Sequence, residues 1–231
     1  YKSALIQLLN NFSQFKRSLF DKQVLLNYFQ LNRDILIRTV CLQVCFLFIT
    51  FQGARLGDTV VAANAILMNF LLLISFSLDG IANAAEAMVG KAYGEKNSKQ
   101  LKTTVSITLF WSLIFACFYS LLFATLGPFF LSLISDIPSV IEFAQQYIVW
   151  MILLPLVSCW CFLYDGIYIG LMQAKVMRNS MIIATFACFF PVWFLLQDFG
   201  NHGLWAAFSI FMLARGATLA WHFHCYQTKN N

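Results

Sequence analysis

The sequence predicts an all-α integral membrane protein whose fold class is a bundle of six transmembrane helices. Six apolar stretches fill the chain from Leu36 to Phe223, and about 20 apolar residues are enough to cross a hydrocarbon core of ~30 Å. Hydrophobic residues make up 60% of the sequence and charged residues 11%, whereas soluble domains are about 45–50% apolar and 25% charged. The basic residues also alternate between connections, which supports an even number of spans.

The six predicted spans follow one another with short connections. They are Leu36–Gly53, Val60–Val89, Leu101–Phe130, Val140–Met172, Met181–Leu196 and Gly203–Phe223. Residues 1–34 mix Leu and Phe with Lys and Arg, which is typical of an amphipathic helix on the membrane surface or of the end of a preceding span. Asn32-Arg33-Asp34 then provides a polar start to the first span. We therefore expect a linker over residues 1–34, a six-helix lobe over 35–226 and a tail over 227–231.

The connections and prolines predict how these spans are joined. Only the segment Arg55–Thr59 separates spans one and two, so these helices are expected to be antiparallel neighbours. The segment Asp198–Gly203 is typical of a tight turn. Pro155 and Pro191 fall inside spans four and five, where proline removes a backbone hydrogen bond and bends the helix. Such bends suit a cavity that opens and closes, although they also occur in inert bundles.

The net charge of +5 is a signal of topology. Lys and Arg gather before the first span, in the second and fourth connections and after the last span, whereas only Arg55 falls in an odd-numbered connection. The odd connections carry the acidic residues Asp58, Asp136, Glu142 and Asp198 instead. By the positive-inside rule, both ends of this multi-pass chain are expected in the cytoplasm.

Composition and motifs exclude several other classes of protein. Topology accounts for the basic charge, so the lipid bilayer is an expected partner and nucleic acid is not. The seven cysteines lie almost wholly in the spans without a CxxC pair, which favours small apolar side chains at helix contacts over disulfides or a metal site. The sequence contains no GxSxG, phosphate-loop or HExxH motif, so we expect neither an enzyme nor a cofactor.

One polar stripe runs along the second span. Ser75, Asp79, Asn83 and Glu86 are spaced by four, four and three residues, which places them on one face of a helix. Asp79 lies about 18 Å from Lys91 along the helix, at a depth where a lone carboxylate costs about 2.5–3.5 kcal/mol. Glu86 lies only about 8 Å from Lys91, so it is either functional or an interfacial carboxylate paired with Lys91. We expect the stripe to serve cation coupling or to line a substrate cavity.

Asp165 in the fourth span and Arg215 in the sixth are further deep charges. Asp165 lies about 15 Å from Lys175 along its helix, at a depth similar to that of Asp79. If the two aspartates are close, repulsion favours binding of a proton by one of them, as a proton-coupled transporter requires. Alternatively, Arg215 forms an ion pair with one aspartate, and the sequence does not choose between Asp79 and Asp165.

Several motifs occur in order along residues 25–225. They are NRDILIRT (32–39), AANAILMNF (62–70), DGIANAAEAMVGKAYG (79–94), DGIYIG (165–170), MRNSM (177–181), GNHGLW (200–205) and ARG (214–216). The series resembles the DinF branch of the MATE family of multidrug and toxic-compound exporters. The resemblance implies a protein of the bacterial inner membrane with two six-span lobes, of which this chain is the second and the N-terminal lobe is missing.

The resemblance also implies a function, namely export of lipophilic, often cationic compounds in exchange for protons or sodium ions. Asp165 matches an acidic residue that takes part in cation coupling in the family. The sodium-coupled branch adds a glutamate in the lobe's first span, where this chain has only Gln43 and Gln52, so the proton is the expected coupling ion. In the DinF branch the proton-binding aspartate is assigned to the first lobe.

Two other functions stay open at this point. A lipid-linked saccharide flippase shares the architecture but requires a cationic cavity for pyrophosphate, and Arg215 is the single deep candidate for one. A membrane-embedded enzyme or an assembly subunit would require a catalytic cluster near an interface, which only Glu86 with His222 and His224 could begin to form.

Overall fold

The chain folds into a bundle of long helices. The computed structural model describes residues 22–229. The long helices there are α2 (Lys22–Leu56), α3 (Asp58–Gly94), α4 (Ser98–Ile134), α5 (Pro138–Gly170) and α8 (Asn201–Lys229). Between α5 and α8 runs a composite span of α6 (Ala174–Ile183), the π-helical η1 (Ala184–Phe189), α7 (Phe190–Leu196) and the 3₁₀ turn η2 (Gln197–Phe199). Within residues 22–229, six helical segments are long and apolar enough to cross a membrane, which confirms the six predicted spans.

Helices α2 and α8 extend beyond the expected boundaries of the lobe. The boundary at residue 34 lies inside α2, because Asp34 does not cap the helix. It is buried, and Arg178 of α6 donates a hydrogen bond of 2.7 Å to its carboxylate. Helix α8 continues to Lys229, past the expected boundary at residue 226. Residues 1–21 of the linker and 230–231 of the tail lie outside the described residues.

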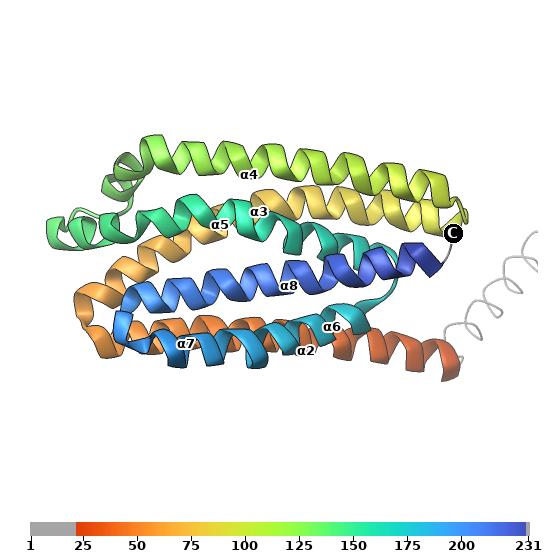
Figure 1. Ribbon diagram of the computed structural model, residues 1–231, viewed down its shortest axis with the longest axis horizontal. Coiled ribbons are helices and arrows are strands. Elements are labelled where there is room, and N and C mark those ends of the chain that lie inside the picture. Colours follow the sequence, from red (N-terminus) through yellow and green to blue (C-terminus); the bar gives the residue numbers. More distant parts are fainter. Residues whose placement is uncertain (1–21, 230–231) are drawn as a thin grey trace, which may run out of the picture.

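Helix α5 is the centre of the bundle. Every residue from Cys161 to Tyr168 is buried, and α3, α4 and α8 all pack against α5. Figure 1 shows α4 at one edge of the bundle and α2 with α6 and α7 at the other, while α3 crosses from the second edge to the first. Helix α4 exposes large apolar side chains such as Phe110, Phe118 and Leu121, as a lipid-facing helix does.

The two ends of the bundle differ in charge and in contacts. The starts of α2, α4 and α6 share one end with the ends of α3 and α5 (Figure 1). We call it the basic end, because its connections carry Lys91, Lys96, Lys99 and Lys175. At the opposite end, Asn64 of α3 and Asn201 of α8 exchange buried amide hydrogen bonds of 2.8 and 2.9 Å, and Trp205 donates a third to Asn64. These bonds satisfy polar groups that lipid could not solvate.

Small residues bring α3 and α5 into close contact. Gly166 and Gly170 are spaced as a GxxxG motif on α5, a spacing that lets two membrane helices approach closely. A Cβ atom at Gly166 would collide with the backbone carbonyl oxygen of Ala82, and one at Gly170 would lie 2.6 Å from that of Glu86. The contact sets the register between the helices, so the turn of α3 that carries Asp79 lies at the depth of Asp165.

The fifth span departs from regular α-helix just before its proline. The π-helical turn η1 ends at Phe189, and Pro191 sits in the first turn of α7, where its missing N–H is tolerated. Pro155 lies within α5 without ending the helix. Of the two expected bends, the one at Pro191 thus coincides with a change of helix type. The buried Thr185 of η1 lies 3.9 Å from the thiol sulfur of Cys45 on α2.

The α3–α5 contact generates a stability prediction. Gly166→Ala is expected to destabilise the protein by about 1–3 kcal/mol, because a methyl group must displace the backbone of Ala82. Gly80→Ala on α3 is the matched control, since nothing lies within 4 Å of a Cβ at that position. The control should be neutral or stabilise by up to about 1 kcal/mol. Thermal unfolding in detergent measures both, and equal melting temperatures for the two variants would contradict the close packing.

Candidate functional site

The most buried charged group of the lobe is a three-residue ion cluster centred on Asp165. Asp165 lies in the fully buried part of α5 with 5% of its surface exposed. Its Oδ2 atom accepts hydrogen bonds from Nη2 of Arg38 on α2 and from Nη2 of Arg215 on α8. One carboxylate therefore joins three helices, and we call Arg38, Asp165 and Arg215 the ion triad.

The two arginines of the triad have different surroundings. Arg215 is 1% exposed, and its guanidinium carbon lies 5.7 Å from the ring centre of Phe162. Its Nη1 atom lies 3.8 Å from the Met212 sulfur. The side chain of Arg38 is 21% exposed, and its ion pair with Asp165 is the one that the structure gives it among the described residues. Arg38 is thus the outer member of the triad and Arg215 the inner one.

The triad has a surplus of positive charge and of unused polar atoms. Two guanidinium groups and one carboxylate sum to one net positive charge. Four buried polar atoms have no hydrogen-bond partner among the described residues, namely Nε of Arg38 and Arg215, Oδ1 of Asp165 and Oγ of Ser158. Ser158 lies two turns before Asp165 on the same face of α5. A buried site of this kind can accept further polar groups or water.

The polar stripe of α3 lies on an open face of the lobe. Asp79 and Asn83 are exposed, and Glu86 is partly exposed. Within residues 22–229, neither Asp79 nor Glu86 forms an ion pair with a basic side chain. Asp79 nevertheless interacts electrostatically with Arg38, Asp165 and Arg215. The five expected site residues therefore divide into Asp165 with Arg215 inside the lobe and Asp79, Asn83 and Glu86 on its surface.

The structure bears on alternatives that the sequence left open for these carboxylates. Glu86 is not paired with Lys91, because their atoms lie beyond ion-pair distance in the described structure. Asp165 is paired with two guanidinium groups, and Asp79 also interacts with it electrostatically. Of the two aspartates, Asp165 is the one that Arg215 binds.

Arg38 is the member of the ion triad that sequence reasoning missed. A first span that starts near residue 35 places Arg38 at the membrane surface, where an arginine is ordinary. The described part of α2 reaches back to Lys22, which is about 24 Å from Arg38 along the helix. One signal was available, since Asp34 and Arg38 are four residues apart and lie on one face with Cys41 and Cys45, all of which face the bundle.

The site contains no metal-binding geometry. Among residues 22–229, no three His, Cys, Asp or Glu side chains come together as metal ligands would. The carboxylate of Asp165 faces two positive charges, which repel a cation from the position that the family resemblance assigns to cation coupling. The cysteines of the described chain are free thiols.

Comparison with known proteins identifies the family. The family model MatE matches residues 35–195, which is more than half of the chain. The chain belongs to the MatE family. It is 40% identical over 196 residues to DNA damage-inducible protein F of Escherichia coli K12, a match that covers 84% of this chain and 42% of that protein. It is 24% identical over 193 residues to the multidrug resistance protein NorM of Vibrio vulnificus, with 80% and 42% coverage.

Solved structures of the family share the fold. A crystal structure of MATE in the bent conformation superposes with a TM-score of 0.78 at 14% identity, over 91% of this chain and 48% of that one. The Vibrio cholerae MATE transporter VcmN in the bent form gives 0.75 at 17% identity, over 86% and 45%. The chain thus spans less than half the length of these relatives, of which VcmN is named as a transporter.

The ion triad generates a prediction about charge balance. Asp165→Asn leaves two buried guanidinium groups without a counter-charge, so it is expected to destabilise the protein by about 3–5 kcal/mol. Arg38→Gln should cost less than about 1 kcal/mol, because it leaves the neutral Arg215–Asp165 pair. Adding Arg38→Gln to Asp165→Asn should therefore restore part of the lost stability.

Melting temperatures of the wild type, both single variants and the double variant complete this cycle. Arg55→Gln, at an exposed position in the opposite end of the bundle, is the control for loss of one arginine and should change stability little in either background. Strictly additive effects of Arg38→Gln and Asp165→Asn would refute the triad.

Proposed function

We propose that this chain is the C-terminal lobe of a multidrug exporter of the bacterial inner membrane. The exporter moves lipophilic or cationic compounds out of the cell in exchange for protons. One observation carries the proposal: Asp79 is exposed on a helix packed against α5 and interacts electrostatically with an ion triad that has one surplus positive charge. By the positive-inside rule the basic end faces the cytoplasm, and with it both ends of the described chain.

The charges provide a simple logic for antiport. When Asp79 is ionised, its charge balances the surplus of the triad, and the four groups together are neutral. When Asp79 binds a proton, one positive charge is left uncompensated beside the open face and repels a cationic compound. A proton and a cationic substrate therefore compete for the same carboxylate, which is the requirement for exchanging one for the other.

The proton fits this site better than sodium. A sodium ion needs several oxygen ligands, and the carboxylate of Asp165 is already bound by two guanidinium groups. Gln43, in the span where the sodium-coupled branch carries a glutamate, is exposed on the outer surface of α2. Asp165 and Gln43 therefore do not provide a set of ligands for a sodium ion. Asp79 needs only contact with water to exchange a proton.

The exposed polar stripe of α3 supports the proposal that a second lobe covers this face. Asp79, Asn83 and Glu86 lie on a surface of the lobe that hydrocarbon cannot solvate. A second six-helix lobe with a water-filled cavity between the two would satisfy them. The shares of relatives and solved structures that the chain covers, 42–48%, agree with one lobe of two.

The alternative of a lipid-linked saccharide flippase gains no support from the second buried arginine. Arg38 adds a guanidinium group to Arg215, but Asp165 binds both. A pyrophosphate would have to compete with that carboxylate and would also face Asp79 on the same side. The acidic stripe favours a cationic compound over an anionic one.

Asp79 and Glu86 are predicted to differ in function. In the complete two-lobe protein in proteoliposomes, Asp79→Asn should abolish dye export driven by a proton gradient, because an amide neither exchanges a proton nor balances the triad. Glu86→Gln should change the rate by less than about twofold, since Glu86 lies one to two turns from the triad at the basic end. Fluorescence of a cationic dye measures both at equal protein content. A larger loss for Glu86→Gln would contradict the assignment.

The chain alone is predicted to be inactive. Proteoliposomes that contain only these 231 residues should show no dye movement driven by a proton gradient, because half of the proposed cavity is missing. Co-expression of a matching first lobe should restore transport. Movement by the chain alone at the rate of a two-lobe relative would show that it is a transporter in its own right, for instance as a homodimer.

A further inference from the structure

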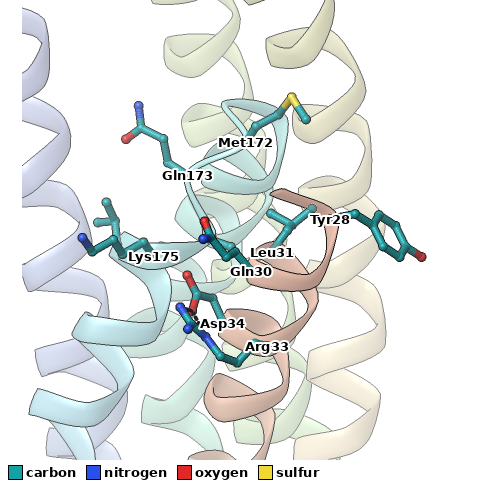
Figure 2. Close-up of a pocket in the computed structure, with 10 residues that line it drawn as sticks. Tyr28, Gln30, Leu31, Arg33, Asp34, Met172, Gln173 and Lys175 are labelled. Carbon is teal, nitrogen blue, oxygen red and sulfur yellow. Dashed lines mark hydrogen bonds and ion pairs between the residues drawn. The ribbon is translucent and has the colours of Figure 1, made fainter. Parts of the chain in front are cut away.

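A cavity of about 960 Å³ opens at the basic end of the bundle, and none of the three residues of the ion triad lines it. Figure 2 shows its walls. Leu31, Arg33 and Asp34 come from the N-terminal half of α2, and Met172 and Lys175 come from the α5–α6 connection and the start of α6. Neither the antiport logic nor the polar stripe of α3 uses this cavity.

Basic side chains dominate the charge around the cavity. Asp34 is its acidic residue, and Arg178 already binds that carboxylate at 2.7 Å. Arg33 contacts the same carboxylate at 3.1 Å, but its own side chain is 58% exposed. Lys175 forms no ion pair with another described residue. Arg33, Lys175 and Arg178 together carry three positive charges and Asp34 carries one negative charge. The net charge around the cavity is therefore +2, which attracts an anion.

The apolar part of the cavity lies at the level of the membrane surface. The membrane-spanning segments of α2 and α6 begin at Tyr28 and Ala174, and both residues line the cavity. Met172 exposes 73% of its surface on a turn with positive φ, and Tyr28 exposes 62%. Exposed aromatic and apolar groups beside basic ones at the ends of spans are typical of contact with lipid headgroups.

We propose that this cavity binds the headgroup of an anionic phospholipid, with the phosphate between Arg33 and Lys175 and the start of the acyl chains against Leu31 and Met172. The volume exceeds that of a phosphate ion, and the walls combine charge with apolar surface. The proposal does not depend on the proposed transport activity. A bound headgroup would link α2 to α6, and α2 also carries Arg38 of the ion triad.

Binding of phosphatidylglycerol to the complete protein in detergent tests the proposal, with phosphatidylcholine of the same acyl chains as the neutral comparison. Native mass spectrometry gives both dissociation constants. The wild type should prefer phosphatidylglycerol, and each of Arg33→Gln and Lys175→Gln should weaken that binding about fivefold. The double variant should weaken it by more than about tenfold and leave phosphatidylcholine unchanged.

Two further variants separate a built site from general attraction to a basic surface. Lys91→Gln combined with Lys99→Gln removes the same charge from the same end of the bundle, outside the cavity, and should change affinity less than about twofold. Gln30→Trp fills the cavity at an exposed position and keeps both basic residues, yet it should weaken binding. Melting temperatures identify variants that fail to fold. If the double variant fails to fold, the lipid affinities of Arg33→Gln and Lys175→Gln alone test the proposal.

Three results would overturn the proposal. The first is equal loss of affinity in the Lys91/Lys99 control, which would mean diffuse attraction. The second is unchanged binding in Gln30→Trp, which would place the lipid elsewhere. The third is inorganic phosphate binding as tightly as phosphatidylglycerol and displacing it, which would make the site one for free phosphate.

Discussion

The buried carboxylate of Asp165 joins three helices of the lobe. It accepts hydrogen bonds from arginines on α2 and α8 while sitting on α5, so three helices share one anion. The apolar core is divided at this depth. One cluster includes Phe162 and Met212, and the other includes Ile167 and Leu219. A buried charge is costly unless it is paired. The charges of Arg38, Asp165 and Arg215 can be paired only when α2, α5 and α8 meet at this depth.

The close α3–α5 contact couples this cluster to the open face. Because Gly166 follows Asp165 directly and packs against the backbone of Ala82, helix α3 is held against the helix that carries the buried carboxylate, with Asp79 about one turn from the contact. Asp79 is therefore exposed on the surface of the lobe and still interacts electrostatically with the triad. Transport in this account requires that coupling, since a surface carboxylate without the triad would only bind a cation and a triad without Asp79 would only repel one.

Much of the fold can be predicted from patterns along the sequence, whereas most contacts of the ion triad cannot. Hydropathy and charge alternation predict six spans because bilayer thickness and the positive-inside rule act on each span separately. Helical periodicity likewise predicts the stripe of α3. The partner of Arg215 depends instead on how α5 and α8 pack across 50 residues of sequence, and that of Arg38 on a contact across 127. Helix α2 also continues through the polar segment that resembles a helix start, because Arg178 satisfies Asp34 through a tertiary contact.

The central claim is that guanidinium groups, and not a metal cation, compensate Asp165. The most direct measurement is the melting temperature of the complete two-lobe protein in sodium chloride and in choline chloride at matched ionic strength, for the wild type and for Asp165→Asn. A cation that binds the folded protein raises its stability. The account predicts no sodium-specific rise that depends on Asp165. A rise in sodium that the wild type shows and Asp165→Asn loses would contradict it.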